Sequence, residues 1–445
     1  MHDHERSQTV DQEKALLVRV IMPNDSVSGE PLEELAGLAE TVGVVIVGGI
    51  TQKRQKLDSS SCLGKGKLEE LHQLVETCDA DVVIFDNDLT PSQTRNLEKT
   101  LKVKVIDRTE LILDIFASNA RTYESRLAVE LAQLEYSLPR LKRLWTHLSR
   151  YSMGVGMRGP GEKQLEIDRR LVEKRIYDLR SEIKTIEHRK ERQVSARQDQ
   201  MTVSLVGYTN SGKSTLMNSL TAAGVTAENK LFATLDTRTR RWQLPSWGPV
   251  LLSDTVGFIR DLPHRLITSF KATLEETRQA NLLLHVADAS NPSALEQISA
   301  VSEVLHELGI DSKDTVLVAN KIDLSTQKQH LDTLLRRYPN AVPISARTKE
   351  GFDRLAKTVS DALSRTFHDV DVETGVENGK LMAYLAAHGE ILSKRFHETR
   401  VTIHCRLPGK HLGRIAGPTV TVRQHQIQHP DDNGPHVDSS TEDMA

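Results

Sequence analysis

The chain has 445 residues, of which 38% are hydrophobic and 27% charged, and its formal net charge is -3. This length predicts several domains, because one domain usually takes about 100–200 residues. The charge excludes a uniformly basic nucleic-acid-binding protein but leaves room for a local basic patch.

Other features of the composition concern the compartment. No stretch approaches the roughly 20 consecutive apolar residues that span a bilayer. The first residues, MHDHERSQTVDQEK, contain no apolar core of a signal peptide. The three cysteines, Cys62, Cys78 and Cys405, match neither a disulfide framework nor a zinc site. We therefore expect a cytoplasmic protein with reduced thiols and no integral membrane contact.

Residues 1–118 are expected to form an N-terminal α/β domain. Short runs rich in valine and isoleucine (ALLVRVIM, GVVIVGGI, DVVIFD, KVKVID) alternate with segments of helical spacing such as PLEELAGLAETV and GKLEELHQLVETC. Strands that alternate with helices predict βαβ units and a mostly parallel sheet.

Residues 119–198 are expected to form a long helical hairpin. Apolar residues recur at heptad-like spacings from Leu127 to Leu148 and again from Leu165 to Ile186, which predicts two helices packed along a shared seam. Pro139 predicts a kink or break in the first helix. Between the two runs, SRYSMGVGMRGPGEKQ contains four glycines and a proline, which stop a helix.

The rest of the chain predicts three further parts. Residues 199–365 alternate strand and helix again (TVSLVGY, GPVLLSDTVG, NLLLHVAD, DTVLVANKID, AVPISAR) and predict a doubly wound α/β domain. Residues 366–424, with LMAYLAAHG as a helix and RVTIHCRLP as a strand, predict a small α+β domain. Residues 425–445 are polar and rich in proline, aspartate and serine, so we expect a disordered tail.

The stretch LVGYTNSGKS has the pattern G-x-x-x-x-G-K-S between an apolar strand and a helix. In that context, backbone N–H groups and the helix N-terminus cradle phosphate oxygens. Lys213 would reach the β- and γ-phosphates, and the Ser214 hydroxyl would ligate Mg²⁺. The predicted contacts with the phosphates are Gly207, Tyr208, Thr209, Asn210, Ser211, Gly212, Lys213, Ser214 and Thr215.

The base that accompanies these phosphates is indicated by NKID, which follows the apolar strand DTVLVA. The Asp323 carboxylate can accept hydrogen bonds from both N1–H and the exocyclic amine of guanine, whereas adenine offers no such pair of donors. The motif ISAR at the end of the next strand could supply a backbone N–H to the guanine O6. The predicted base contacts are Asn320, Lys321, Ile322, Asp323, Ser345, Ala346 and Arg347.

The motif DTVG ends another strand and predicts the γ-phosphate sensor. Asp254 would hold Mg²⁺ through water, and the Gly257 N–H would bind the γ-phosphate and reorient after hydrolysis. In the intervening KLFATLDTRTR, Thr234 is the candidate for a second Mg²⁺-binding hydroxyl, with Thr237 and Thr239 as alternatives. We assign catalysis to Lys213, Thr234 and Gly257, and further nucleotide contacts to Phe232, Ala233, Leu235, Asp236, Thr255 and Val256.

These motifs, in this order and spacing, resemble the translation-factor-related class of P-loop GTPases. One departure concerns hydrolysis. Ras-like proteins place a glutamine after the DTVG glycine to position the attacking water, and here that residue is Phe258. Intrinsic hydrolysis should therefore be slow and depend on a partner or a local rearrangement. Asn210 resembles the P-loop asparagine of GTPases that bind K⁺ beside the phosphates, which makes K⁺ a second candidate cofactor.

The hairpin tip combines cations, aromatic residues and glycines. Cations neutralise phosphate and aromatic faces stack on bases, so structured RNA is the favoured target, although a solvated charged helix face is the alternative. The candidate RNA contacts are Arg140, Lys142, Arg143, Arg150, Tyr151 and Arg158.

Four stretches, GMRGPGEKQLEIDRR, LGKGKLEEL, LFATLD and DTVGFIRDLP, together resemble the HflX family of GTPases over nearly the whole chain. Two departures are the residues beyond about 424, which have no match, and SMGVGMRGPGE, which differs slightly from the usual lead-in. The resemblance implies a GTP-hydrolysing enzyme linked to the large ribosomal subunit, and some relatives separate ribosomes into subunits. We expect a monomer that binds ribosomal RNA but not DNA. The alternatives are a signalling GTPase with a protein partner and a GTPase of ribosome assembly or RNA processing.

Overall fold

The computed structural model describes residues 13–23, 25, 30–141, 160–195, 201–221, 231–232, 235, 237–245, 248–260, 276–310, 313–324, 328–365, 367–415 and 419–425. The chain divides into two compact units. The first contains residues 1–243 and 249–359, and the second contains residues 244–248 and 360–445. None of the helices within the described ranges is long and apolar enough to cross a membrane.

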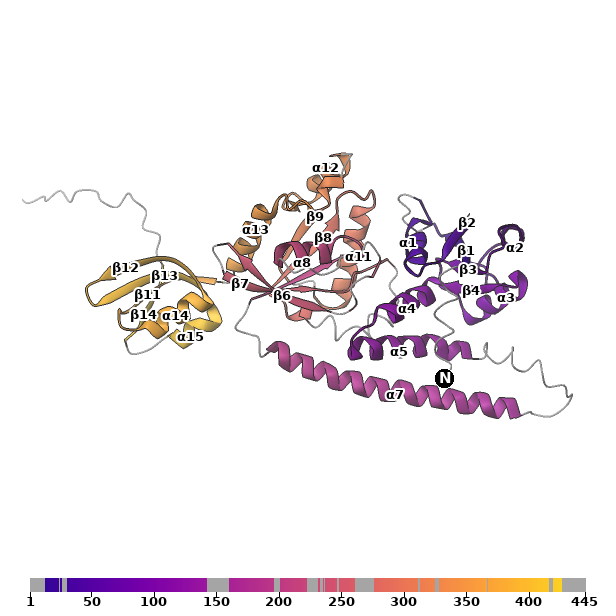
Figure 1. The fold of residues 1–445 in the computed structure, drawn as a ribbon, viewed down its shortest axis with the longest axis horizontal. Coiled ribbons are helices and arrows are strands. Elements are labelled where there is room, and N and C mark those ends of the chain that lie inside the picture. Colours follow the sequence, from indigo (N-terminus) through magenta and orange to yellow (C-terminus); the bar gives the residue numbers. More distant parts are fainter. Residues whose placement is uncertain are drawn as a thin grey trace, which may run out of the picture. The chain divides into compact units, whose positions relative to one another are not determined.

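The first unit begins with a parallel four-stranded sheet in the order β2-β1-β3-β4 (Figure 1). Its strands are β1 (Lys14–Ile21), β2 (Val45–Lys53), β3 (Val82–Phe85) and β4 (Lys104–Asp107). The helices are α1 (Glu33–Thr41), α2 (Lys65–Cys78), α3 (Pro91–Leu101) and α4 (Arg108–Asn119).

The near-continuous apolar run of β1 is explained by burial on both faces of the sheet. Ala15 and Leu17 belong to a core that includes residues of α1 and α4. Leu16 and Val18 alternate with them and belong to a second core with residues of α2 and α3. The predicted α/β fold class is confirmed here, with helices on both sides of a parallel sheet.

A helical hairpin follows, formed by α5 (Tyr123–Ser137), a short 3-10 helix (Leu138–Arg140) and α7 (Pro160–Ser195). The predicted heptad residues make the seam between α5 and α7 (Figure 1): Leu127, Leu131, Leu134 and Leu138 lie against Val172, Ile176, Leu179, Ile183 and Ile186. The 3-10 helix contains Pro139, where the proline predicted a break. The predicted tip, residues 142–159, lies outside the described residues.

The second sheet of this unit has six strands in the order β10-β9-β8-β5-β7-β6. They are β5 (Thr202–Gly207), β6 (Arg238–Leu244), β7 (Gly248–Asp254), β8 (Leu282–Asp288), β9 (Thr315–Asn320) and β10 (Val342–Pro343). The accompanying helices are α8 (Lys213–Thr221), α11 (Ala294–Glu307), α12 (Lys328–Arg337) and α13 (Phe352–Ser364). Neighbouring strands β7-β5-β8-β9-β10 run parallel, so their carboxyl ends meet at one edge, where ligands of such sheets bind.

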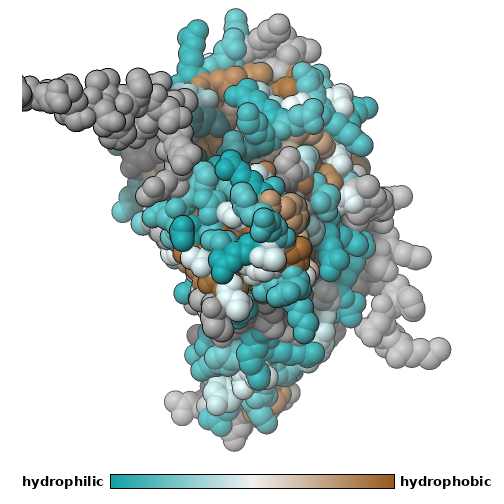
Figure 2. Space-filling model, turned by 90° about the vertical axis from the view of Figure 1, so that its left-hand side faces the viewer, coloured by the Kyte–Doolittle hydropathy of each residue, from teal (hydrophilic) through white to brown (hydrophobic). Residues whose placement is uncertain are grey.

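The second unit contains an antiparallel sheet in the order β12-β13-β11-β14. Its strands are β11 (Phe367–Gly375), β12 (Glu390–His397), β13 (Arg400–Pro408) and β14 (Thr421–Gln424), and its helices are α14 (Gly379–His388) and α15 (Gly409–Ile415). Apolar residues of β11 and β13 form the core with residues of both helices, which agrees with the expected small α+β fold. Figure 2 is a space-filling view and shows mainly hydrophilic side chains with smaller hydrophobic areas between them. The predicted tail, apart from His425, lies outside the described residues.

Candidate functional site

The P-loop lies between the end of β5 and the start of α8, at the carboxyl edge of the second sheet. Positive φ angles at Gly207 (152°), Asn210 (57°) and Gly212 (92°) turn the backbone of this loop. Thr209 and Ser211 are buried, and neither side-chain hydroxyl has a hydrogen-bond partner among the residues that the structure describes. Because buried polar groups are normally satisfied, these hydroxyls indicate a polar ligand such as a phosphate chain.

Lys213 carries the positive charge of the P-loop. Its ammonium group is buried and donates to the carbonyls of Gly207 (3.0 Å) and Tyr208 (2.8 Å). Burial lowers the pKa of Lys213 to about 8, an effect that Asp254 opposes and Lys321 reinforces. The lysine is therefore already placed where a phosphate anion would complete its hydrogen bonds and stabilise its charge.

The lowered pKa of Lys213 gives a testable prediction. At a pH of about 9, the free protein should hold Lys213 mostly neutral, and a bound phosphate chain should restore the pKa towards its usual value of about 10.4. Nucleotide binding should then take up close to one proton at about pH 9 and much less at about pH 7. Calorimetric titrations in two buffers with different ionisation enthalpies measure this uptake, and the Lys213→Met variant provides the control. Equal uptake at both pH values would contradict the assignment.

Ser214 and Asp254 form the candidate metal end of the site. The Ser214 Oγ donates to Asp254 Oδ2 over 2.6 Å, which brings a hydroxyl and a buried carboxylate together beside the P-loop. Oxygen ligands of this kind suit a hard divalent cation bound next to phosphates. The two residues thus fit a nucleotide-bound divalent metal ion, and their identity as Mg²⁺ ligands stays a prediction.

The NKID motif is connected to the P-loop by Asn320. Its Nδ2 donates to the Ser211 carbonyl (2.8 Å), and its Oδ1 accepts from the Ala346 N–H (2.9 Å). Asn320 therefore links the predicted phosphate site with ISAR, the last motif predicted for the base. Asp323 is exposed, and one of its carboxylate oxygens accepts from Ser345 Oγ at 2.7 Å.

The other residues predicted to contact the base include Lys321, Ile322 and Arg347. Lys321 has a positive φ of 65° and pairs with Asp288 at 2.7 Å. Ile322 is half-buried and Arg347 is exposed. The structure thus brings NKID and ISAR together next to the P-loop, and their contacts with guanine stay predictions.

The DTVG motif continues from β7 onto the P-loop. Phe258 N donates to the Gly207 carbonyl (3.0 Å) and Thr209 N donates to the Phe258 carbonyl (2.7 Å), so the segment pairs with the loop like a short parallel strand. The Phe258 side chain is 3% exposed and lies in the core. Phe258 therefore packs the segment, and no catalytic hydrogen bond can come from its side chain. Thr255 is also buried and donates through Oγ1 to the Leu205 carbonyl.

The segment LFATLD is described only in part. Phe232 is buried and contacts Phe116 of α4 edge to face, with ring centroids 4.7 Å apart. Leu235 is buried in the same core. Both predicted nucleotide contacts thus have core side chains, and their role towards GTP stays a prediction.

Of the three candidate Mg²⁺-binding threonines, the structure describes Thr237 and Thr239. Thr234, together with Ala233 and Asp236, lies outside the described residues. Thr239 lies in β6 and donates to Glu276 at 3.0 Å. Thr237 precedes β6 and is half-buried. The described residues therefore leave Thr234 as the prediction for this hydroxyl.

Of the candidate RNA contacts, only Arg140 lies within the described residues. Its guanidinium covers the Tyr136 ring at 3.6 Å from the centroid and donates to the Leu89 carbonyl (2.7 Å) and to Asp107 (3.3 Å). These contacts join the hairpin base to the ends of strands in the N-terminal sheet. The other candidates, Lys142, Arg143, Arg150, Tyr151 and Arg158, lie in the undescribed tip.

A cluster of Asp371, His404 and His425 on the sheet of the second unit was not anticipated. One possible ligand atom from each lies within 4.8 Å of the others. The two imidazole rings are stacked, with centroids 3.6 Å apart and planes at 17°. Because an imidazole binds metal in its ring plane, stacked rings cannot share one ion without turning. His404 instead pairs with Asp369, and His425 with Asp371.

Sequence reasoning also missed two residues of the N-terminal domain, one in α1 and one in α4, that contact the nucleotide domain. Glu34 accepts from the Tyr208 hydroxyl at 2.6 Å, and Arg108 donates to the Arg260 carbonyl at 3.0 Å. Nothing in their local sequence pattern distinguishes them from ordinary charged residues at helix starts.

The P-loop at the end of β5, the linked NKID and ISAR motifs and the DTVG segment define a P-loop GTPase. Three family descriptions match successive parts of the chain: GTP-binding GTPase N-terminal (residues 29–117), GTP-binding GTPase Middle Region (119–197) and 50S ribosome-binding GTPase (202–321). The chain is 44% identical to GTPase HflX of Caldanaerobacter subterraneus subsp. tengcongensis over 88% of its own length and 90% of the relative.

It is also 47% identical to GTPase HflX of Escherichia coli (strain K12), over 79% of this chain and 83% of that one. The chain therefore belongs to the HflX family of GTPases, and it hydrolyses GTP. Among solved structures, a GTP-binding protein from the archaeon Sulfolobus solfataricus in complex with GDP is similar, with 23% identity, a TM-score of 0.41, and coverage of 79% of this chain and 99% of that one.

Proposed function

We propose that this GTPase binds the large ribosomal subunit, promotes the dissociation or recycling of ribosomes, and hydrolyses GTP faster when it is bound there. The observation that supports this most directly is the match of residues 202–321 to the family described as 50S ribosome-binding GTPase. The buried Phe258 adds a physical reason for a partner, because the residue after DTVG offers no group to position water.

In this proposal Mg²⁺ is the divalent metal ion, and Ser214 and Asp254 hold it together with Thr234. The ion neutralises the charge that develops on the phosphates. Lys213 binds the phosphate chain, and the backbone around Gly212 donates to it. Asn210, whose side chain is exposed at a φ of 57°, is proposed as a K⁺ ligand.

The proposed ribosomal contacts are the N-terminal domain and the basic, glycine-rich hairpin tip, residues 142–159. The seam between α5 and α7 gives this tip a stiff support, because α7 alone extends over 36 residues. Cations at such a tip can neutralise RNA phosphates, so binding should weaken with salt.

The experiment measures GTP turnover with and without purified large subunits, in K⁺ and in Na⁺. Subunits should raise turnover by about 10-fold or more, as partners that complete a GTPase site do, and K⁺ should exceed Na⁺. A double variant, Arg143→Ala with Arg150→Ala, should lose most stimulation and keep basal turnover, whereas Arg189→Ala with Arg192→Ala in α7 serves as a charge-matched control. If subunits neither bind nor stimulate, a signalling GTPase or another RNA partner becomes the better proposal.

A further inference from the structure

The N-terminal sheet has a topological switch point at the carboxyl ends of β1 and β3, and we call this place the crevice. The chain passes from β1 to β2 on one side and reaches β3 on the other, so β1 and β3 flank the point where the strand order reverses. Open parallel sheets bind ligands at this point. Asn87 joins the two strand ends here, because it donates to the Val20 carbonyl and accepts from the Val20 N–H.

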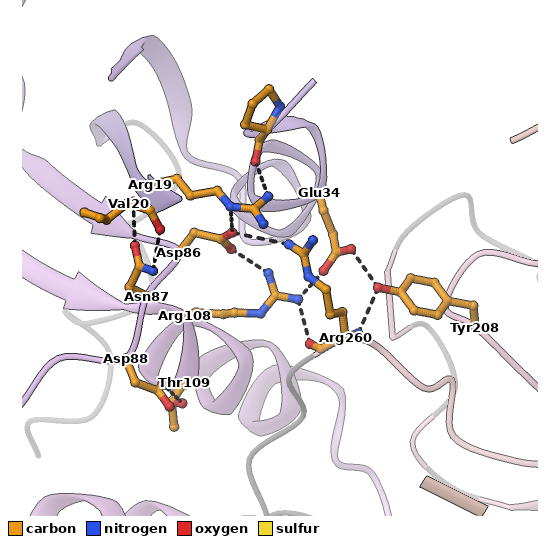
Figure 3. A network of polar contacts seen from close by, with 11 residues as sticks. Arg19, Val20, Glu34, Asp86, Asn87, Asp88, Arg108, Thr109, Tyr208 and Arg260 are labelled. Atoms are coloured by element: carbon orange, nitrogen blue, oxygen red, sulfur yellow. Dashed lines mark hydrogen bonds and ion pairs between the residues drawn. The ribbon is translucent and has the colours of Figure 1, made fainter. Parts of the chain in front are cut away.

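Part of the GTPase domain occupies this crevice (Figure 3). Arg108, at the start of α4, donates to the Arg260 carbonyl at 3.0 Å and also to Glu34 and Asp86. The Arg260 side chain reaches Asp86 at 3.4 Å. The segment after DTVG therefore lies where such a sheet would hold a ligand. We call Glu34, Asp86, Arg108, Tyr208 and Arg260 the crevice network.

Tyr208 of the P-loop belongs to the same network. Its hydroxyl donates to Glu34 at 2.6 Å and accepts from the Arg260 N–H at 2.8 Å. Burial and the Glu34 carboxylate raise the pKa of Tyr208, so the hydroxyl stays protonated. One phenol thus connects the P-loop, the segment after DTVG and the N-terminal domain.

The charges of this network are largely withdrawn from water. The side chains of Arg108 and Asp86 are 3% and 4% exposed. Arg19 adds a second buried guanidinium, 3.3 Å from Asp86. If one partner of a buried ion pair moves away, the other charge stays buried and uncompensated, which costs free energy. This interface should therefore strongly favour the arrangement in which these ion pairs are formed.

That arrangement places Gly257 directly against the P-loop. A Cβ atom built on Gly257 would lie 2.9 Å from Thr209 Cγ2 and 3.1 Å from Lys213 Nζ. The N–H and the carbonyl of the next residue, Phe258, are both bonded to the P-loop backbone. A γ-phosphate that accepts from both Lys213 and the Gly257 N–H has to enter between these two groups, so we expect GTP binding to shift the backbone from Gly257 to Arg260 away from the P-loop.

The other switch segment is attached to the N-terminal domain as well. Asn119 at the end of α4 donates to the Phe232 carbonyl at 3.1 Å, and Leu231 packs at Gly37 of α1. Phe232 and Phe258 belong to one continuous core with Leu35 and Phe116. Both segments that respond to the γ-phosphate are thus packed on α1 and α4.

From these contacts we infer that Glu34, Arg108 and Tyr208 are positioning residues that hold the Gly257–Arg260 backbone against the P-loop, and so favour the binding of GDP over GTP. By reciprocity, a GTP-bound protein holds its N-terminal domain less tightly, and a partner that occupies the crevice favours GTP. This inference depends on the nucleotide chemistry of the family and not on the proposed ribosomal role.

The test compares nucleotide affinities of the full chain without ribosomes. Glu34→Ala and Tyr208→Phe should each raise the affinity for GMPPNP relative to GDP by about 5-fold or more, within the usual range of such couplings. The double variant should raise this affinity ratio little more than either single variant does, because both changes remove the same hydrogen bond between Tyr208 and Glu34. Tyr136→Phe is the matched control, since it removes a part-buried phenol–carboxylate bond to Asp107, which lies in the N-terminal sheet and outside the GTPase domain.

Two outcomes overturn the inference. If folded Glu34→Ala and Tyr208→Phe proteins show an unchanged or lowered ratio of GMPPNP to GDP affinity, the network does not oppose GTP. Should the variants fail to fold, hydrogen exchange on the unmodified protein decides. Amides of residues 256–260 and of the start of α4 should exchange faster with GMPPNP than with GDP, and equal or slower exchange contradicts the inference.

Discussion

Asp323→Asn should convert this protein from a guanine-nucleotide enzyme into one that prefers xanthine nucleotides. In the predicted base site the carboxylate would accept from two donors of guanine, whereas an amide would meet the guanine amine with its own N–H₂ group. Xanthine carries an oxygen in place of that amine and can accept from the amide. We expect GTP affinity to fall by about 100-fold or more, because a base site whose hydrogen-bonding groups do not match those of the ligand leaves buried polar groups unpaired.

The measurement is turnover and equilibrium binding with GTP and XTP side by side. Asp332→Asn in α12 removes an equally exposed carboxylate away from the site and should change neither. The prediction also has a structural basis, since Asp323 lies next to ISAR through its bond from Ser345 Oγ. An Asp323→Asn protein that still prefers GTP would show that the base is read elsewhere.

Gly212→Ala should abolish nucleotide binding by separating the phosphate and base parts of the site. Gly212 has a φ of 92°, and a Cβ atom there would lie 2.3 Å from Asn320 Nδ2. That nitrogen makes the bond to the Ser211 carbonyl, so Asn320 or the P-loop must move. Displacements of this size cost about 100-fold or more in a well-oriented site, and the strained backbone should cost a further ~1–3 kcal/mol of stability.

Gly309→Ala separates backbone strain from the clash. Gly309 also has a positive φ, 68°, but nothing lies within 4 Å of its built Cβ. This control should lose stability and keep its affinity for GDP, as measured by thermal unfolding and fluorescent nucleotide titration. If Gly212→Ala binds GDP as tightly as Gly309→Ala does, Asn320 does not join the two parts of the site.

Local patterns were enough to predict much of the fold. The strand β1 was predicted from its valine and leucine run, because a strand buried on both faces must be apolar throughout. The seam between α5 and α7 was predicted from heptad spacing, since both partners of the seam follow the same period. In contrast, β6 was missed. Its residues, RTRRWQL, are mostly polar, and only Trp242 and Leu244 turn towards the core.

The candidate site, too, was predicted in part from local patterns. The P-loop, NKID and DTVG motifs are short, and their chemistry needs particular residue types at fixed spacings, so the sequence by itself determined a GTP site. Arg140 shows what the local pattern did not determine. Folding brings its guanidinium to Asp107 and Leu89, and its contact with RNA stays a prediction.

What only the tertiary structure decided is how the switch segments are held. Glu34 and Tyr208 are 174 residues apart, and Arg108 and Arg260 are 152 apart. Such pairs leave no periodic trace in a sequence, because each residue alone is an ordinary charge or phenol at the start of a helix or loop. The motifs determine which nucleotide this protein hydrolyses. The packing of α1 and α4 against the P-loop and the DTVG segment determines what else moves when the γ-phosphate arrives, since buried charges and a continuous core tie them to one arrangement.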